Sequence, residues 1–252
     1  MYFSTALPLR PAEGVSLAKD GGSIRRAQLT CGADGGASAI AALPWDRYMR
    51  LEAAAREVRA LAGELGHALT IIDLGGFEGA LALFLPEHEV YVVDPATTGG
   101  SGLSLDSGDQ SFDVSVSLDV IEHLLKDERP QFLGEQLRVS SHLCLVGYPS
   151  ASSIAAQEVV LEITDDRQVH EHIEFGLPDD DYIKSTLEKM GAVVDFKPHT
   201  AISLWATYAA LSGLNSMAAA LLSKYLIDIE RKHHRSSDEP CVYQLAIARR
   251  VK

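Results

Sequence analysis

The sequence is poor in cysteine and begins without a secretory pattern. Its 252 residues include 3 cysteines, Cys31, Cys144 and Cys241, which are odd in number and far apart. This spacing indicates neither a disulfide framework nor a zinc site, and it suits a reducing compartment. The start of the chain also lacks the basic end and the continuous apolar core of a signal peptide. We therefore expect a cytoplasmic protein.

Basic residues are also scarce. The chain has 22 Lys and Arg against 35 Asp and Glu, which gives a formal net charge of −13 at pH 7. Because an acidic surface repels a phosphate backbone, this balance argues against nucleic acid as a partner. The apolar content of 46% and the charged content of 23% are typical of globular proteins. The length suits one α/β domain with additions.

Charge is absent altogether from residues 201–223, a stretch long enough for a membrane-spanning helix. Serine, threonine and asparagine side chains interrupt this stretch, and predicted sheet strands flank it. We therefore expect no integral membrane span. A helix from near Ile202, a break at residues 213–215 and a second helix to near His233 explain the pattern better.

The chain does contain a glycine turn between two apolar runs. The run Ile71–Ile72 ends in Asp73, and Gly75 and Gly79 follow. A short helical run comes next, and then a second apolar run that ends in Asp94. The order strand, glycine turn, helix, strand and acid is the plan by which an α/β sheet holds a nucleotide-like ligand at its strand ends.

The spacing of the glycines differs from the dinucleotide fingerprint. That fingerprint requires Gly-x-Gly-x-x-Gly, and counted from Gly75 its second and third glycine positions hold Phe77 and Ala80. An NAD-linked oxidoreductase is therefore the less favoured interpretation. An ordinary strand-to-helix turn is the alternative that carries no function.

A second patterned stretch spans residues 112–123. Val114, Val116 and Leu118 alternate with polar residues, which predicts a strand, and acidic and histidine residues follow its end. The pattern then predicts a helix at residues 129–139 and a further strand after it.

Taken together, the Asp73–Gly79 motif, Asp94 and residues 112–139 resemble the class I S-adenosylmethionine-dependent methyltransferases, in their small-molecule group. The resemblance covers residues 68–148. It implies an α/β, Rossmann-like, seven-stranded sheet that is mostly parallel and has an antiparallel last strand.

Three regions follow from the resemblance and the composition. We expect an N-terminal arm at residues 1–43, a methyltransferase domain at residues 44–252, and within this domain a helical insertion near residues 198–240. The arm is rich in Gly, Ala and Ser, so we expect it to be irregular with at most a short strand or helix, and either mobile or folded over the ligand cleft.

A helix should lead from Trp45 into the glycine motif and end at Gly66. In the resembling family such a helix often helps to close the cleft. Arg47 or Arg50 could then meet the carboxylate of the cofactor, although a solvated helix face is the simpler interpretation of each.

Residues 95–111 are too few and too glycine-rich for the helix and strand that a regular domain of this kind would place there. We expect a trimmed sheet edge on this side, with residues 103–105 as a remnant strand. Ser101 is the nearest polar candidate for an adenine contact.

The resemblance implies S-adenosylmethionine as the cofactor. The glycine turn would line its methionine part, Asp94 would hold the ribose, and the main chain after the strand at residues 112–118 would lie beside the sulfonium. The cofactor-binding residues implied in this way are Asp73, Gly75, Gly76, Gly79, Asp94, Leu118 and Asp119.

Methyl transfer to an alcohol or phenol also needs a group that removes a proton. Glu122 and His123 follow a strand tip, and His170 and His172 fall in a predicted loop before a helix that begins near Asp179. We expect His170 or His172 to be the general base, with His123 and Glu122 as further candidates. Capping a helix or bonding within the loop are the structural alternatives.

The spacing of Asp119, Glu122 and His123 also resembles certain quinone-biosynthesis O-methyltransferases, in which such a cluster holds a divalent cation. Because the Glu-His pair is widespread at this place in the group, we expect no metal here.

The sequence thus predicts an S-adenosylmethionine-dependent methyltransferase that acts on a hydroxyl of a small-molecule acceptor, such as a sugar or another biosynthetic intermediate. A non-catalytic module that keeps the nucleotide fold is the alternative from another class. The helical insertion could cap the acceptor pocket or form a homodimer.

Overall fold

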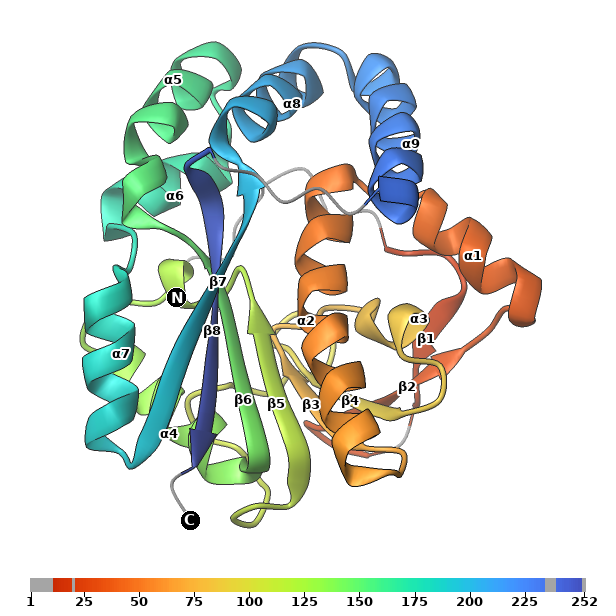
Figure 1. The fold of residues 1–252 in the computed structure, drawn as a ribbon, viewed down its shortest axis with the longest axis vertical. Helices are drawn as coiled ribbons and strands as arrows, with labels where there is room; N and C mark the ends of the chain where they lie inside the picture. Colours follow the sequence, from red (N-terminus) through yellow and green to blue (C-terminus); the bar gives the residue numbers. More distant parts are fainter. Residues whose placement is uncertain (1–10, 20, 234–238, 251–252) are drawn as a thin grey trace.

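The computed structural model describes residues 11–19, 21–233 and 239–250, and in this part of the chain eight strands form one sheet. Their order across the sheet is β1-β2-β4-β3-β5-β6-β8-β7 (Figure 1). The strands are β1 (Val15–Leu17), β2 (Arg25–Leu29), β3 (Thr70–Leu74), β4 (Glu89–Val93), β5 (Phe112–Leu118), β6 (Ser140–Pro149), β7 (Ala192–Ala201) and β8 (Cys241–Arg250).

The centre of the sheet is parallel and its edges are antiparallel. Strands β4, β3, β5 and β6 pair in parallel, whereas β8 runs antiparallel to both of its neighbours, β6 and β7. The predicted α/β sheet with a reversed last strand is therefore confirmed, although the described residues form eight strands and not the seven expected. All the carboxyl ends of the parallel strands meet at one edge of the sheet, which is the upper edge in Figure 1.

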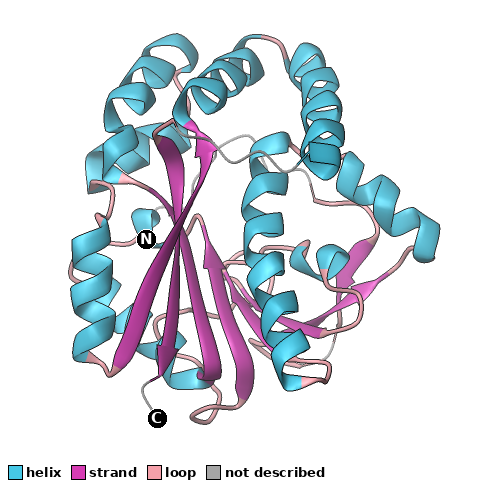
Figure 2. Ribbon diagram, viewed as in Figure 1, coloured by secondary structure: helices cyan, strands magenta, loops and turns pink. Residues whose placement is uncertain are grey.

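Helices cover both faces of the sheet and the edge where the parallel strands end (Figure 2). Four of them lie against the faces: α2 (Trp45–Leu65), α3 (Leu81–Phe84), α4 (Arg129–Val139) and α7 (Asp180–Lys189). The others are α1 (Ala33–Ala41), α5 (Ile154–Thr164), α6 (Arg167–Phe175), α8 (Ile202–Leu214) and α9 (Ser216–His233), with the 3-10 turns η1 (Ile121–His123) and η2 (Ala151–Ser153).

Successive strand residues supply the cores on the two faces. Ile71 belongs to the core beneath α2, with Val58, whereas Ile72 belongs to the core beneath α4, with Leu133. Side chains alternate across a strand, so a strand that is covered on both faces must be apolar at consecutive positions. This explains why β3 appears in the sequence as a continuous apolar run.

Helix α2 carries the chain into β3, as predicted. Its apolar stripe, which includes Leu51, Ala54, Val58 and Leu61, is buried against the sheet. The helix ends where Gly66 adopts φ +76° and donates its N–H to the carbonyl of Ala62 at 2.8 Å. A left-handed residue at this position is the usual reason for a glycine after a helix.

The N-terminal arm is more ordered than its composition predicts. Strand β2 pairs antiparallel with β4, with Arg25 opposite Val92, and β1 extends the sheet beyond it. The predicted remnant strand at residues 103–105 is wrong, because this segment is a turn with one bridge between Ser101 and Ser104. The arm itself therefore supplies the sheet edge, and its first ten residues lie outside the described part.

The insertion between β7 and β8 holds the predicted helix pair. Helix α8 ends at Leu214 and α9 begins at Ser216, so the break falls where the sequence places it. Together with α5 and α6, this pair lies beyond the ends of the parallel strands (Figure 1). None of the helices in the described ranges is both long and apolar enough to cross a membrane.

Candidate active site

Three adjacent parallel strands end side by side and bring the sequence motifs together. In the sheet register Leu74 of β3 lies opposite both Val93 of β4 and Ser117 of β5. The residues that follow these strands, from Gly75, Asp94 and Asp119 onward, therefore share one edge. In open α/β sheets this edge is where ligands bind.

The glycine turn is shaped by its own neighbours. Gly75 has φ +77° and donates its N–H to the carbonyl of Val93 at 2.8 Å. A Cβ on Gly75 would lie 2.5 Å from Cγ2 of Val120, and one on Gly76 would lie 2.4 Å from Oδ2 of Asp73. Side chains at either position would therefore break the packing of the turn on the loop after β5 and on Asp73.

Asp73 lies beneath this turn and is 3% exposed. Burial raises the pKa of its carboxyl to about 7, although the nearby guanidinium of Arg47 acts in the opposite direction. The protonation of this carboxyl near pH 7 therefore depends on the balance between its burial and the charge of Arg47.

Asp94 fixes the loop that follows β4. Its Oδ1 accepts hydrogen bonds from the backbone N–H groups of Ala96 and Thr97, both at 2.9 Å. The hydroxyl of Thr97 also donates to the carbonyl of Phe77 at 2.6 Å, which joins this loop to the glycine turn. Since these backbone donors bond Oδ1, a ligand would be held by Oδ2.

The two arginines proposed for the cofactor carboxylate lie in different places. Nη2 of Arg47 bonds both carboxylate oxygens of Glu78, at 2.8 and 3.0 Å. Its Nη1 is buried and has no hydrogen-bond partner among the described residues. Arg50 instead pairs with Asp119 and lies 5.3 Å from the ring centre of Tyr243. Of these two arginines, Arg47 is the one with a side-chain nitrogen that has no partner among the described residues.

A second group of residues converges beyond β5. Glu122 in η1 is 0% exposed, and neither of its carboxylate oxygens has a hydrogen-bond partner among the described residues. Nε2 of His172 lies 4.0 Å from Oε1 of Glu122 and 3.4 Å from Nε2 of His123. One ligand atom from each of these three residues lies within 4.8 Å of the others. We refer to Glu122, His123 and His172 as the Glu-His-His cluster.

Acceptors on α5 and α6 hold the two imidazoles. Nδ1 of His172 lies 2.8 Å from Oε1 of Gln157, whose amide nitrogen donates to the hydroxyl of Ser153 at 2.9 Å. Nδ1 of His123 lies 3.1 Å from a carboxylate oxygen of Glu171. Because both partner atoms are acceptors, each Nδ1 carries a proton, and the Nε2 atom of each ring faces the cluster.

Burial controls the charge of the cluster. It raises the pKa of the Glu122 carboxyl to about 7. It also lowers the pKa of His123, against the effect of Glu171, and lowers that of His172 well below its ordinary value, with smaller contributions from His123 and Arg50. Both imidazoles are therefore neutral near pH 7.

The predicted loop around His170 is wrong, because residues 167–175 form helix α6. Residues two apart on a helix face different directions. His172 is buried, whereas the His170 side chain is 61% exposed and lies 3.8 Å from Glu174 on the same helix. The structure thus brings His172, His123 and Glu122 together and places His170 outside this group.

Gln157 was not predicted from the sequence, and Glu171, between the two candidate histidines, was given no role of its own. Gln157 is completely buried, three positions before Val160 on the inner face of α5, so a polar residue on an apolar helix face was its only signal. No metal was expected from the sequence, whereas the carboxylate and two imidazoles that the structure brings together are groups that bind divalent cations.

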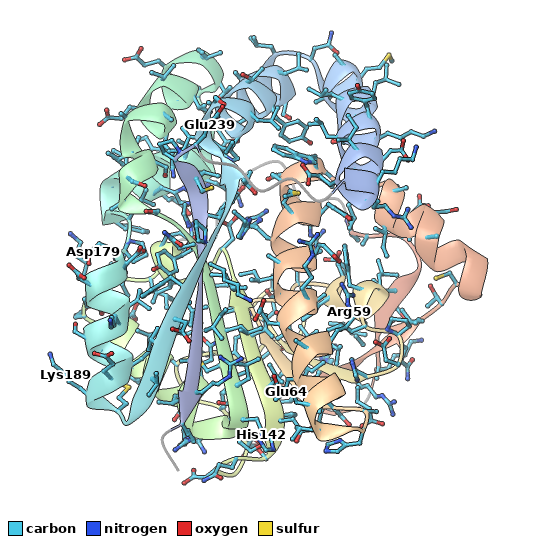
Figure 3. All side chains as sticks on the ribbon, viewed as in Figure 1. Arg59, Glu64, His142, Asp179, Lys189 and Glu239 are labelled. Atoms are coloured by element: carbon cyan, nitrogen blue, oxygen red, sulfur yellow. The ribbon has the colours of Figure 1, made fainter. Side chains whose placement is uncertain are left out.

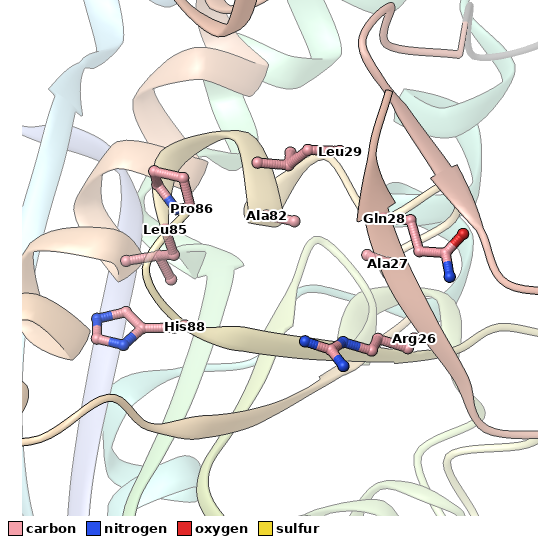
Figure 4. A pocket seen from close by; sticks show the side chains of 8 residues that line it. All are labelled: Arg26, Ala27, Gln28, Leu29, Ala82, Leu85, Pro86 and His88. Atoms are coloured by element: carbon pink, nitrogen blue, oxygen red, sulfur yellow. The ribbon is translucent and has the colours of Figure 1, made fainter. Parts of the chain in front are cut away.

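A hollow of about 210 Å³ lies between β2 and α3 (Figure 4). Its lining includes Arg26, Leu29 and Leu85, and it contains none of the residues that directly follow the parallel strands β3, β4 and β5. It is therefore separate from the candidate active site.

No protein-family model and no curated protein matches this sequence. The fold is similar to that of a SAM-dependent methyltransferase from Archaeoglobus fulgidus, with a TM-score of 0.50, 12% identity, and coverage of 79% of this chain and 94% of that one. It is also similar to the small RNA methyltransferase HEN1, with a TM-score of 0.50, 17% identity, and coverage of 81% of this chain and 25% of that one. The chain has the class I S-adenosylmethionine-dependent methyltransferase fold.

Proposed function

We propose that this protein transfers a methyl group from S-adenosylmethionine to a hydroxyl of a small-molecule acceptor, such as a sugar or another biosynthetic intermediate. One observation carries the proposal: the glycine turn, Asp94 and the Glu-His-His cluster lie at the same edge of a sheet with the methyltransferase fold. A nucleotide-like ligand at the turn would then lie next to groups that can accept a proton.

The residues at the strand ends fit this cofactor. Oδ2 of Asp94 would accept hydrogen bonds from the ribose hydroxyls, while Oδ1 keeps its bonds to the loop. The free Nη1 of Arg47 would bond the carboxylate of the methionine part. The main chain at Leu118 and Asp119 would lie beside the sulfonium, where η1 and the Glu-His-His cluster begin.

The reaction is an in-line displacement. The bond from sulfur to the methyl carbon breaks, the acceptor oxygen forms a bond to that carbon, and the cofactor leaves as a neutral thioether. The protein must align the two reactants and exclude water. The acceptor hydroxyl must also lose its proton, for which the neutral Nε2 of His172 or His123 is placed.

Charge favours a small acceptor over nucleic acid. The structural neighbour HEN1 is a small RNA methyltransferase. This chain, however, has a net charge of −13, which opposes the binding of a phosphate backbone. The charge and the cysteine content also support the expectation of a cytoplasmic enzyme.

Calorimetric titration tests the cofactor first. S-adenosylmethionine and its demethylated product should each bind at one site, and NAD should not. Methyl transfer from radiolabelled cofactor to a panel of sugars, phenols and carboxylic acids then identifies the acceptor. Binding of neither sulfur compound would leave a non-catalytic module, and selective binding of NAD would favour an oxidoreductase.

We also propose that α9 joins two copies of this chain. Met217, Leu221 and Tyr225 form an apolar stripe on this helix and are 75%, 70% and 63% exposed. The stripe borders a groove that also includes Ala41. Light scattering should give the mass of a dimer, and Leu221→Glu should give the mass of a monomer. A monomeric wild-type chain would exclude this assembly.

A further inference from the structure

We propose that Glu122, His123 and His172 bind a divalent transition-metal cation, and that Gln157 and Glu171 are positioning residues that aim both imidazoles at it. The site deepens the proposed function, on which its catalytic role rests. Its ability to bind a cation can be measured without cofactor or acceptor.

The two imidazoles turn their Nε2 atoms toward each other. The Nε2 atoms of His123 and His172 lie 3.4 Å apart, and each ring directs its Nδ1 at an acceptor outside the cluster. One ligand atom from each histidine and from Glu122 thus lies within 4.8 Å of the others. A cation between the two Nε2 atoms would form a coordinate bond to each of them.

Glu122 brings a buried carboxylate to the cluster. It is fully buried, both of its oxygens lack a hydrogen-bond partner among the described residues, and Oε1 lies 4.0 Å from Nε2 of His172. A buried carboxylate without hydrogen-bond partners is costly for a fold. Arg50 and Arg129 act on its charge from nearby, and a cation at the centre of the cluster would bond its oxygens directly.

Hydrogen bonds around the cluster hold its residues in place. Gln157 lies between His172 and Ser153, whose hydroxyl donates to the carbonyl of Ser150 at 2.7 Å. Arg129 donates to the carbonyl of Gly176 at 2.7 Å and approaches the carbonyl of Glu122 at 3.5 Å, so it joins η1 to the end of α6. Metal-binding histidines commonly give their second N–H to such outer acceptors, which fix the tautomer and the ring orientation.

The ligand set indicates the class of cation. Two imidazoles and one carboxylate suit Mn²⁺, Fe²⁺, Co²⁺ or Zn²⁺ better than Ca²⁺ or Mg²⁺, which prefer oxygen ligands. Three protein ligands also leave coordination positions open for the oxygen atoms of an acceptor. With a cation bound, both Nε2 atoms would hold the cation and would no longer take the proton themselves. The cation would instead lower the pKa of a bound acceptor hydroxyl, so that the hydroxyl could lose its proton to solvent before methyl transfer.

The binding test uses the full chain after removal of metal with a chelator. Mn²⁺ is titrated in the absence of cofactor and acceptor, and binding is followed by electron paramagnetic resonance and by calorimetry. We expect one site per chain. Glu122→Gln and His172→Ala should abolish it, and circular dichroism should show that both variants keep the fold.

A matched control uses a histidine far from the cluster. His142 is exposed near the beginning of β6, at the opposite end of the strands (Figure 3). His142→Ala should bind Mn²⁺ as the wild type does. Absence of saturable binding to the wild type, or equal binding by His172→Ala, would overturn the proposal.

The positioning role has its own readout. Gln157→Leu removes the acceptor for the Nδ1 proton of His172 and should weaken Mn²⁺ binding by about 10- to 100-fold. Gln157→Glu restores an acceptor and should recover most of the affinity, which a merely structural role does not predict. Equal loss in both variants would contradict the role of Gln157. Mn²⁺ binding without cofactor binding would refute the proposed function and leave the metal site standing.

Discussion

Nε2 of His123 and Nε2 of His172 face each other at 3.4 Å, although 49 positions separate the two residues in the chain. The first lies in η1, directly beyond β5, and the second in α6, and each ring is oriented by a different acceptor. His172 makes this contact with His123, whereas His170 does not. Substitutions of His170 and His172 can therefore be compared with each other.

His172→Ala should lower the turnover of methyl transfer by about 100-fold or more, because a buried group at the reacting hydroxyl is lost. His170→Ala should leave turnover nearly unchanged, since its exposed imidazole lies outside the cluster. Both variants should keep the affinity for the demethylated cofactor, which calorimetry measures. Equal losses of turnover in the two variants would refute the assignment of His172.

Asp94 should bind cofactor and stabilise its loop through different oxygens. Asp94→Asn keeps an oxygen that accepts from the N–H groups of Ala96 and Thr97. It should weaken cofactor binding by about 10- to 100-fold, through loss of a charged acceptor, with little change in melting temperature. Asp94→Ala should lose both affinity and thermal stability. Unchanged affinity in Asp94→Asn would exclude the contact with the ribose.

Arg47 should recognise one part of the cofactor only. Arg47→Lys keeps a charge opposite Glu78 but removes the free Nη1. Affinity for S-adenosylhomocysteine should fall by about tenfold, whereas affinity for methylthioadenosine, which lacks the carboxylate, should hold. Calorimetry of both ligands gives the ratio, and an equal loss for both would contradict the contact.

Asp73 should make stability depend on pH. Its pKa is about 7 in the folded chain against an ordinary value of 3.8, with Arg47, Asp94 and Glu78 as its charged neighbours. The folded state therefore binds the extra proton, so its stabilising effect is complete below pH 3.8 and disappears as the pH rises through 7. The change is at most about 4 kcal/mol. Urea unfolding from pH 5 to 8 should show a smaller decline in Asp73→Asn, and parallel profiles would exclude this effect.

Local sequence patterns predicted the elements that depend on near neighbours. The run Ile71–Leu74 followed by Gly75 and Gly79 specifies a buried strand and a turn with positive φ angles, because only glycine adopts such angles without cost. The end of α2 at Gly66 and the break between α8 and α9 follow from the same kind of local signal.

The sheet edge could not be predicted in this way. Strand β2 pairs with β4, yet most of its side chains are exposed and its sequence is rich in arginine. A short strand without alternating apolar residues carries little local information. A Cβ added at Gly79 would lie 2.7 Å from the Cβ of Ala27 in β2. This close contact between the arm and the glycine turn arises only in the folded structure.

What the sequence determined by itself is the order of strand, glycine turn, helix and acid from Ile71 to Asp94, because backbone angles and buried faces are encoded locally. Only the tertiary structure decided which histidine joins the Glu-His-His cluster. His170 and His172 are two positions apart and chemically identical, and they differ because α6 turns one toward Gln157 and His123 and the other toward solvent. That choice depends on the packing of α5, α6 and η1, which no local pattern encodes.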